Sequence, residues 1–237
     1  ADRGMRFYPT PMLALNQQLP FRISLHASAA RSIRFPTMHH LFSPGFGNET
    51  LHPEEAVKYE TGLKRTFQLK NYLLTCDAAF FSNHLTHLIY RRSATARFRN
   101  VNTARLSGVD ISIALSGTKF SLSIGYTATP AHMTSSLLLE HRSEHRCNLR
   151  ISADLPWDAT CYYSINYLGT RSTYTDVFLS SYYLHQLRLT QPLFKGLSLK
   201  FSISNILDTS FQEQLGYPAP GRRLFLGLTW QRTGEQR

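Results

Sequence analysis

The feature that most constrains this chain is a period of two in its hydropathy. Apolar side chains occupy every second position from Val109 to Leu115, and after a turn at 116–119 the alternation resumes over 120–127. Successive side chains of a β-strand point to opposite faces, so such a segment has one apolar and one polar face. The pattern predicts a β-hairpin with one face in apolar surroundings.

The same alternation recurs along the chain in segments of about ten residues, the length with which a strand crosses a membrane. We expect about eleven such strands, the fourth of them bent near 82–84. The expected strands cover 12–18, 21–33, 55–67, 72–91, 109–115, 120–127, 149–155, 161–167, the region of 187–189, 197–203 and 224–230.

The connections alternate in length. Short turns are expected at 19–20, 68–71, 116–119, 156–158 and 194–196. Long loops are expected at 35–54, 92–104, 130–144, 170–180 and 208–221. In bacterial outer-membrane barrels the short turns face the periplasm and the long loops face outside.

These features predict an all-β fold, an antiparallel transmembrane β-barrel. Strands rich in outward Leu, Ile and Phe are satisfied in lipid only if the barrel closes. Bacterial single-chain barrels have an even number of strands, so about eleven form part of a 22-stranded barrel. We assign 1–230 to the barrel and 231–237 to a polar C-terminal tail.

Composition excludes several classes of protein. No apolar run approaches the 18 or so residues of a transmembrane helix, and no motif of a hydrolase, phosphate-binding loop or zinc enzyme occurs. The net charge is +11, yet the basic residues form no Lys/Arg-rich run. We therefore expect an anionic small ligand or lipopolysaccharide phosphates rather than nucleic acid as the partner, with a merely basic surface as the alternative.

The chain has three cysteines. Cys147 and Cys161 fall on the two arms of a hairpin that turns near Trp157, with Cys147 opposite Tyr167 and Cys161 opposite Ala153. That register keeps the two sulfur atoms several residue spacings apart, which is too far for a disulfide. We expect three free thiols.

Several stretches, spread from Ser28 to Trp230, resemble TonB-dependent outer-membrane receptors, most closely the vitamin B12, haem and siderophore branch. Two of these stretches are Tyr59–Lys64 and Asn100–Asp110. The positions that match the family motifs are Arg34, Pro36, Asn48, Leu51, Pro53, Glu54, Asn205, Asp208, Gly221 and Arg222, and Trp230 matches the C-terminal aromatic of the barrel. Arg34 and Glu54 fall at strand ends, where charge reaches solvent or lipid headgroups.

The resemblance implies a bacterial outer-membrane transporter that imports a scarce, bulky nutrient such as a ferric siderophore, cobalamin or haem. Its implied partners are outer-membrane lipid and lipopolysaccharide, the barrel assembly machinery, the nutrient, and the TonB complex through a plug that lies outside this sequence. Residues 1–5 lack an apolar leader, so we expect the sequence to begin inside a longer chain, with a mature N-terminus at Ala1 as the alternative. A haem receptor specifically, a plug-less barrel (porin-like or an adhesin anchor) and a soluble all-β protein remain alternatives.

The candidate ligand-binding residues lie in the expected loops. In haem-uptake members of the family, a histidine in the loop between the motif that contains Pro36 and the motif that contains Asn48 binds haem iron. His39 and His40 lie in the corresponding loop of this chain. The other candidates are the loop residues Phe42, Phe46, His132 and Tyr217. Solvated histidines and ordinary loop packing are the alternative. We expect no catalytic residue, no metal site and no resident cofactor.

Aromatic residues near the strand ends are expected to form an interfacial girdle at the membrane surface. They are Trp157, Tyr162, Tyr163, Tyr167, Tyr182 and Tyr183. The charged residues within strands, Asp77, Arg188 and Lys200, are expected to face the barrel lumen, where charge is tolerated.

Overall fold

The computed structural model describes residues 7–91, 95–130, 143–173, 177–194 and 196–231. They form an all-β chain whose main sheet has eleven antiparallel strands, as the sequence predicted. The chain divides into two compact units. The first is formed by the chain up to Lys64 and by Ala78–Asp110, and the second by Arg65–Asp77, Ile111–Ala128 and the part after 140.

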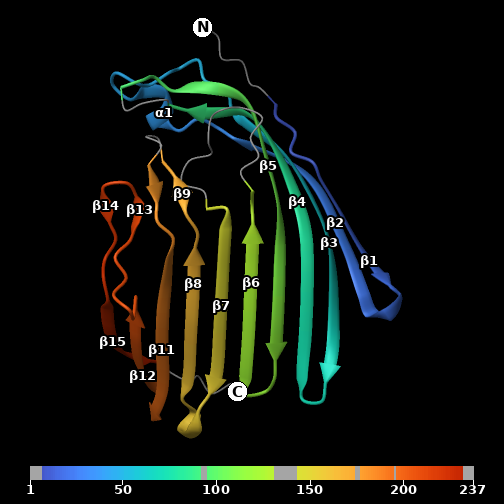
Figure 1. Ribbon diagram of the computed structural model, residues 1–237, viewed down its shortest axis with the longest axis vertical. Coiled ribbons are helices and arrows are strands. Elements are labelled where there is room, and N and C mark those ends of the chain that lie inside the picture. Colours follow the sequence, from blue (N-terminus) through green and yellow to red (C-terminus); the bar gives the residue numbers. More distant parts are fainter. Residues whose placement is uncertain (1–6, 92–94, 131–142, 174–176, 195, 232–237) are drawn as a thin grey trace. The chain divides into compact units, whose positions relative to one another are not determined.

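The strands of the main sheet follow the chain order (Figure 1). They are β1 (Met12–Leu19), β2 (Ile23–Arg34), β3 (Glu54–Leu69), β4 (Tyr72–Tyr90), β5 (Arg99–Ser116), β6 (Phe120–Ala128), β7 (His145–Asp154), β8 (Thr160–Leu168), β11 (Tyr182–Phe194), β12 (Leu197–Ser204) and β15 (Arg223–Trp230). β1 and β15 stand at the two ends of this order, so each has one hydrogen-bonded neighbour in the sheet. The total of 22 strands for an intact barrel stays a prediction.

In the second unit the strand registers separate an apolar face from a polar face. Ile124 pairs with Leu149, Leu149 with Ile165, and Leu187 with Tyr163 and Ile203. Paired residues lie on the same face, so apolar side chains form continuous rows across β6, β7, β8, β11 and β12. Serines, Arg188 and Lys200 occupy the other face, which confirms the predicted alternation.

Two of the tight turns place large side chains in the left-handed backbone region. Phe21 and Arg22 have φ of 62° and 58°, and Trp157 and Asp158 have φ of 61° and 59°. Two successive left-handed residues give a turn whose twist matches that of the flanking strands. Phe21 was expected within the second strand, which is wrong: it lies in the 3-10 turn η1 (Pro20–Arg22), and β2 begins at Ile23. No Gly or Asn marks this turn in the sequence.

One expected loop is shorter than predicted, and others contain secondary structure. Residues 99–104 were expected in a loop but form the start of β5, because strand pairing continues where the side chains are polar and no longer alternate. Other expected loops contain the helix α1 (Met38–Phe42) and two short hairpins, β9 (Arg171–Ser172) with β10 (Phe178–Leu179) and β13 (Gln212–Gln214) with β14 (Tyr217–Pro218). The expected turn at 156–158 is the 3-10 turn η2 (Pro156–Asp158).

The predicted hairpin register of the cysteines is confirmed. Cys147 pairs with Tyr167 and Cys161 with Ala153. Cys76, Cys147 and Cys161 are all free thiols. In the ranges that the structure describes, no helix has the length and apolarity needed to cross a bilayer.

Candidate functional site

In the first unit, the motif residues Arg34 and Glu54 bind each other. Arg34 Nε lies 2.6 Å from Glu54 Oε2, and Arg34 Nη2 donates to Glu54 Oε1 at 2.9 Å. Glu54 Oε1 also accepts the backbone N–H of Ile89 at 2.8 Å, and the Glu54 side chain is only 11% exposed. The expectation that Glu54 reaches solvent or lipid headgroups is therefore wrong: its carboxylate ties together the ends of β2, β3 and β4.

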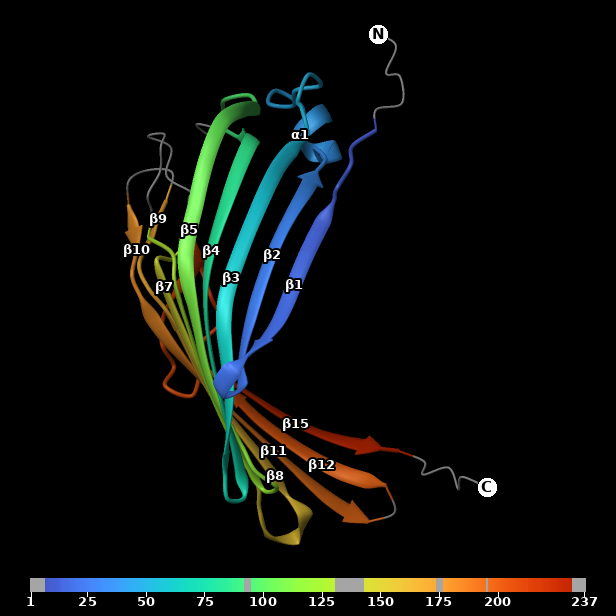
Figure 2. The same cartoon turned by 90° about the vertical axis from the view of Figure 1, so that its right-hand side faces the viewer.

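Helix α1 follows β2 directly, as Figure 2 shows. Pro36 is half-buried, and the next residue, Thr37, caps the helix by accepting the His40 N–H at 3.3 Å. In return the Thr37 N–H donates to Nδ1 of His40, also at 3.3 Å. This reciprocal arrangement is a capping box in which histidine replaces the usual Glu or Gln.

The cap determines the state of the His40 ring. Nδ1 must keep its lone pair to accept the Thr37 N–H, so the proton of the neutral ring is on Nε2. Burial, followed by the positive charge of Arg34, lowers the pKa of His40 below 6.5. His40 is thus held neutral, with a donor rather than a metal-binding lone pair on its outer nitrogen.

His39, unlike His40, is able to present a lone pair on its outer ring nitrogen. Its Nδ1 lies 2.7 Å from Ser43 Oγ. If Nδ1–H donates to that hydroxyl, the Nε2 lone pair is free, which is the arrangement that orients metal-binding histidines. His39 therefore fits the role of a ligand better than His40 does.

His39 and His40 belong to an aromatic group that we call the loop cluster: His39, His40, Phe46, Phe98 and Arg91. The ring of Phe98 lies 5.6 Å from His39 and 4.8 Å from His40. The Arg91 guanidinium lies 4.6 Å from the Phe46 ring and 5.3 Å from the Phe98 ring. Arg91 and Phe98 were not predicted from the sequence, because they lie fifty or more residues from the histidines along the chain. Only the fold brings them beside His39 and His40.

The loop cluster is held in place by the motif residue Asn48. Asn48 donates from Nδ2 to the Phe98 carbonyl at 2.9 Å, and its Oδ1 accepts from the Thr50 N–H at 3.0 Å. Leu51 and Pro53 are half-buried in the extended segment that leads to β3. Of the other predicted ligand residues, Phe42 is 48% exposed at the end of α1, and His132 lies outside the described residues.

In the second unit, the C-terminal motif closes the segment between β12 and β15. The Asn205 side chain binds both the N–H and the carbonyl of Thr209, each at 2.9 Å. Asp208 Oδ1 accepts the Arg222 N–H at 2.7 Å. A Cβ on Gly221 would lie 2.5 Å from this same oxygen, so any larger residue here would displace the Asp208 carboxylate. The motif has a structural role here.

Arg171 connects two loops of the second unit. Its side chain donates from Nη2 to the Gln212 carbonyl at 2.8 Å and from Nη1 to the Glu213 carbonyl at 3.4 Å. The guanidinium also lies over the Tyr182 ring at 5.2 Å. Arg171 is only 4% exposed. This contact was not predicted, because no local pattern marks it.

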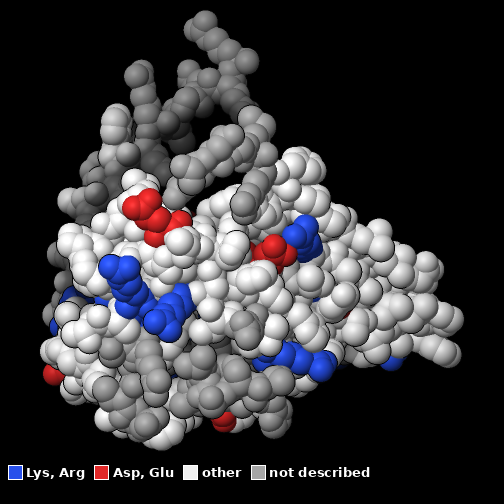
Figure 3. Space-filling view, turned by 90° about the horizontal axis from the view of Figure 1, so that it is seen from above, with Lys and Arg blue, Asp and Glu red and all other residues white. Residues whose placement is uncertain are grey.

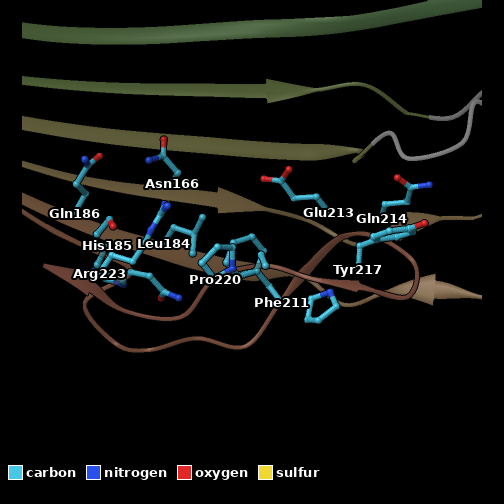
Figure 4. Close-up of a pocket in the computed structure, with 14 residues that line it drawn as sticks. Asn166, Leu184, His185, Gln186, Phe211, Glu213, Gln214, Tyr217, Pro220 and Arg223 are labelled. Carbon is cyan, nitrogen blue, oxygen red and sulfur yellow. The ribbon is translucent and has the colours of Figure 1, made fainter. Parts of the chain in front are cut away.

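A hollow of about 500 Å³ lies between the β13–β14 hairpin and the polar face of β8 and β11 (Figure 4). Asn166 and Gln186 line it from the sheet, and Glu213, Gln214 and Tyr217 line it from the hairpin. Tyr217 is 68% exposed. The predicted ligand residue Tyr217 thus borders an open hollow, lined by both polar and apolar side chains, that is able to hold a hydrogen-bonding solute.

The expected aromatic girdle needs correction at two positions. Tyr162 pairs with Arg188 and stacks beneath its guanidinium at 5.9 Å, and it lies on the polar face. Tyr182 is also on that face, where it packs on Phe211 with the ring centroids 4.4 Å apart. Tyr163, Tyr167 and Tyr183 lie on the apolar face. Trp157 and Trp230 are exposed, at 84% and 67%.

In Figure 3 the basic and acidic side chains occur as small separate groups with uncharged surface between them. Within the described ranges, no group of three or more His, Cys, Asp or Glu side chains is arranged to hold a metal ion.

The structure has antiparallel strands, alternating faces and loops that are held by motif residues. These features agree with a comparison to known families. The family model of the TonB dependent receptor-like β-barrel matches residues 4–206. This chain belongs to the TonB-dependent receptor family. It is accordingly part of a bacterial outer-membrane protein, with the transmembrane β-barrel fold that its sequence predicted.

Individual relatives are distant. The vitamin B12 transporter BtuB of Vibrio cholerae serotype O1 is 22% identical over 233 residues, which cover 94% of this chain and 37% of the transporter. A mutant ferric enterobactin receptor of Pseudomonas aeruginosa has a TM-score of 0.73 at 20% identity, with 93% of this chain and 40% of that chain covered. The siderophore receptor PirA of Acinetobacter baumannii has a TM-score of 0.74 at 16% identity, with the same coverage. The chain thus spans less than half the length of these relatives.

Proposed function

We propose that the TonB-dependent receptor containing this chain imports a scarce, bulky nutrient such as a ferric siderophore, cobalamin or haem. The observation that carries the proposal is the family match over residues 4–206, together with loops that are held by its motif residues. A loop that is fixed on a rigid barrel presents ligand-binding side chains with little loss of entropy.

The loop cluster supports a ligand with flat, electron-rich or anionic groups. Phe46 offers an aromatic ring, Arg91 supplies a cation beside it and His39 supplies an imidazole, while Phe98, which is 9% exposed, is buried against them. A tetrapyrrole or an aromatic iron chelate matches this combination in shape and charge. Tyr217 and the hollow beside it are a second place for contacts with such a ligand.

The same proposal includes the remaining partners. A plug outside this sequence would couple import to the TonB complex, and the strand ending at Trp230 would be recognised by the barrel assembly machinery. Lipid and lipopolysaccharide would surround the apolar face. Nucleic acid is not among the proposed partners, since the basic residues are dispersed.

The experiment that tests import uses the native bacterium with the full-length receptor gene deleted and then restored. Growth is measured with a ferric siderophore, haem or cobalamin as the sole source of the limiting nutrient. We expect growth on one class to depend on the receptor. If growth on all of them is independent of it, the import proposal is wrong.

Haem is tested separately by titrating the purified full-length receptor and following the Soret band. Loss of iron ligation should follow His39→Ala, with a smaller change for His40→Ala because the ring of His40 is engaged in the helix cap. His52→Ala serves as a matched control from the same unit. An unchanged Soret shift in both test variants would remove these histidines as haem ligands.

A further inference from the structure

The hollow beside the β13–β14 hairpin has a lining that restricts which ligand fits it. All of its lining residues belong to the second unit. Strands β8 and β11 contribute Asn166 and Gln186, and the hairpin contributes Glu213, Gln214 and Tyr217. The volume of about 500 Å³ lies within the range of small-molecule sites.

The hairpin wall of the hollow is held in place by contacts within the protein. The guanidinium of Arg171 donates to the carbonyls of Gln212 and Glu213, at 2.8 and 3.4 Å. At the start of the hairpin, the Phe211 ring packs on Tyr182 of β11 with the ring centroids 4.4 Å apart. A ligand that enters the hollow therefore loses little free energy to the ordering of this wall.

Three primary amides line the hollow and are free to bind a ligand. Among the residues that the structure describes, none forms a hydrogen bond with the side chain of Asn166, Gln186 or Gln214. Each amide carries two N–H donors and a carbonyl acceptor. A ligand oxygen that only accepts satisfies one side of such an amide, whereas a hydroxyl group both donates and accepts. The amides therefore favour a ligand with several hydroxyl groups.

One negative and one positive side chain line the hollow, and they favour a neutral ligand. Figure 4 shows Arg223 toward the end with Gln186, and Glu213 toward the end with Gln214. Neither Arg223 nor Glu213 forms an ion pair with another described residue. An extended anion that met the Arg223 guanidinium at one end would meet the Glu213 carboxylate at the other, and like charges repel.

The hairpin also supplies an apolar ring. Tyr217 is 68% exposed, and Pro218 and Pro220 line the hollow near it. A sugar ring has a rim of hydroxyl groups and a face of C–H groups, and an exposed aromatic ring buries apolar area against such a face. The amides and the Tyr217 ring thus match the two kinds of surface that a sugar presents.

We propose that the hollow binds a neutral oligosaccharide, with hydroxyl groups on Asn166 and Gln186 and one sugar ring against Tyr217. The sugar is either a free nutrient or the sugar-bearing part of a larger nutrient. For its physiological use the inference rests on the proposed import function. Binding itself is a property of the hollow and is measured on the purified receptor.

The test uses the full-length receptor, purified in a detergent without a sugar headgroup and screened against an array of neutral and anionic oligosaccharides. We expect binding to be confined to neutral members. Affinity for the best of them, measured by calorimetry, should fall about tenfold in Asn166→Leu and in Gln186→Leu. Asn148→Leu is the matched control, because Asn148 pairs with Asn166 on the same face and is not among the lining residues. Absence of binding to every neutral member, or unchanged affinity in both variants, would overturn the proposal.

Two variants of exposed hairpin residues test the same site without altering the strands. Tyr217→Leu removes the aromatic face, and affinity for the neutral oligosaccharide should again fall about tenfold. Glu213→Gln removes the negative charge at nearly constant size, so neutral binding should persist and anionic oligosaccharides should now bind. Wild-type affinity in Tyr217→Leu, or continued exclusion of anions in Glu213→Gln, would contradict the assignment.

Growth and uptake identify the source of the sugar. Growth on the bound oligosaccharide as sole carbon source, only when the receptor gene is present, would identify a free sugar. Slower receptor-dependent uptake of a larger nutrient in excess oligosaccharide would identify a sugar-bearing part of that nutrient. Neither effect, despite binding, would overturn the assignment of the hollow to import. Receptor-dependent growth on a nutrient without any oligosaccharide binding would overturn this inference alone and leave the import proposal intact.

Discussion

Glu54 forms an ion pair with Arg34, accepts one hydrogen bond from its guanidinium and accepts another from the backbone of Ile89, so one half-buried carboxylate joins the ends of three strands. The two side chains contribute unequally, because the Arg34 side chain is 64% exposed and that of Glu54 only 11%. Solvent weakens the attraction on the arginine side. The larger part of the structural role thus belongs to Glu54.

Replacement of Glu54 should loosen the ends of β3 and β4 more than replacement of Arg34. Glu54→Ala removes the acceptor of the Ile89 N–H, at a cost of about 1–3 kcal/mol for an unpaired backbone group. Arg34→Ala should cost less than about 1 kcal/mol. Hydrogen exchange of the Ile89 amide in the full-length receptor measures the difference, and Glu54→Gln should restore most of the protection. Equal exchange in Glu54→Ala and Arg34→Ala would contradict this assignment.

The cap of helix α1 should depend on pH. The pKa of His40 in the fold is below 6.5 because burial and the Arg34 charge disfavour the imidazolium. The unfolded loop binds the proton more tightly, so stability from the neutral ring is present above pH 6.5 and is lost as the pH falls through the folded pKa. Exchange of the Thr37 amide, which donates to His40, should accelerate over this acidic window.

The control for this pH dependence is Arg34→Gln, which removes the second cause of the shift. Its onset should move to higher pH, toward 6.5. Histidine ring signals in NMR spectra measure the midpoint directly. A midpoint above 6.5 in the wild type would show that the ring is stabilised in its charged form.

Gly221 and Asp208 should be energetically coupled. A methyl group at 221 would lie 2.5 Å from Asp208 Oδ1, the atom that accepts the Arg222 N–H. Gly221→Ala should destabilise the barrel end by about 1–3 kcal/mol, as steric and hydrogen-bond losses do. In an Asp208→Gly background the same change should cost much less, because the clashing oxygen is gone. A double-mutant cycle from urea unfolding measures this coupling, and additive effects would argue against it.

Arg171 should control the order of the segment that contains the β13–β14 hairpin. Arg171→Met keeps much of the side-chain volume but removes the bonds to the Gln212 and Glu213 carbonyls. We expect faster proteolysis within 209–221, by about tenfold, if the lost bonds are worth about 1.5 kcal/mol or more. Arg171→Lys should rescue only part of the protection, because one ammonium group does not reproduce the guanidinium fork. Unchanged proteolysis in Arg171→Met would contradict this role.

The repeating pattern of the sequence was sufficient for the fold. Eleven strands, the hairpin register of Cys147 and Cys161, and the polar face with Arg188 and Lys200 were all predicted correctly. These features depend on local alternation, since the face of a residue is set by its position along its own strand. The motif residues, from Arg34 to Trp230, were found differently, through the resemblance to a known family.

What the sequence by itself determined was therefore the class of fold, the faces of the strands and the membership of the TonB-dependent receptor family. Only the tertiary structure decided that Glu54 is bound by Arg34, that Phe98 and Arg91 join His39, and that Tyr162 and Tyr182 leave the expected girdle. Each of these contacts depends on which strands are neighbours and in which register they pair. Alternation along one strand records the face of each residue, but it does not record which side chains from segments distant in sequence meet on that face.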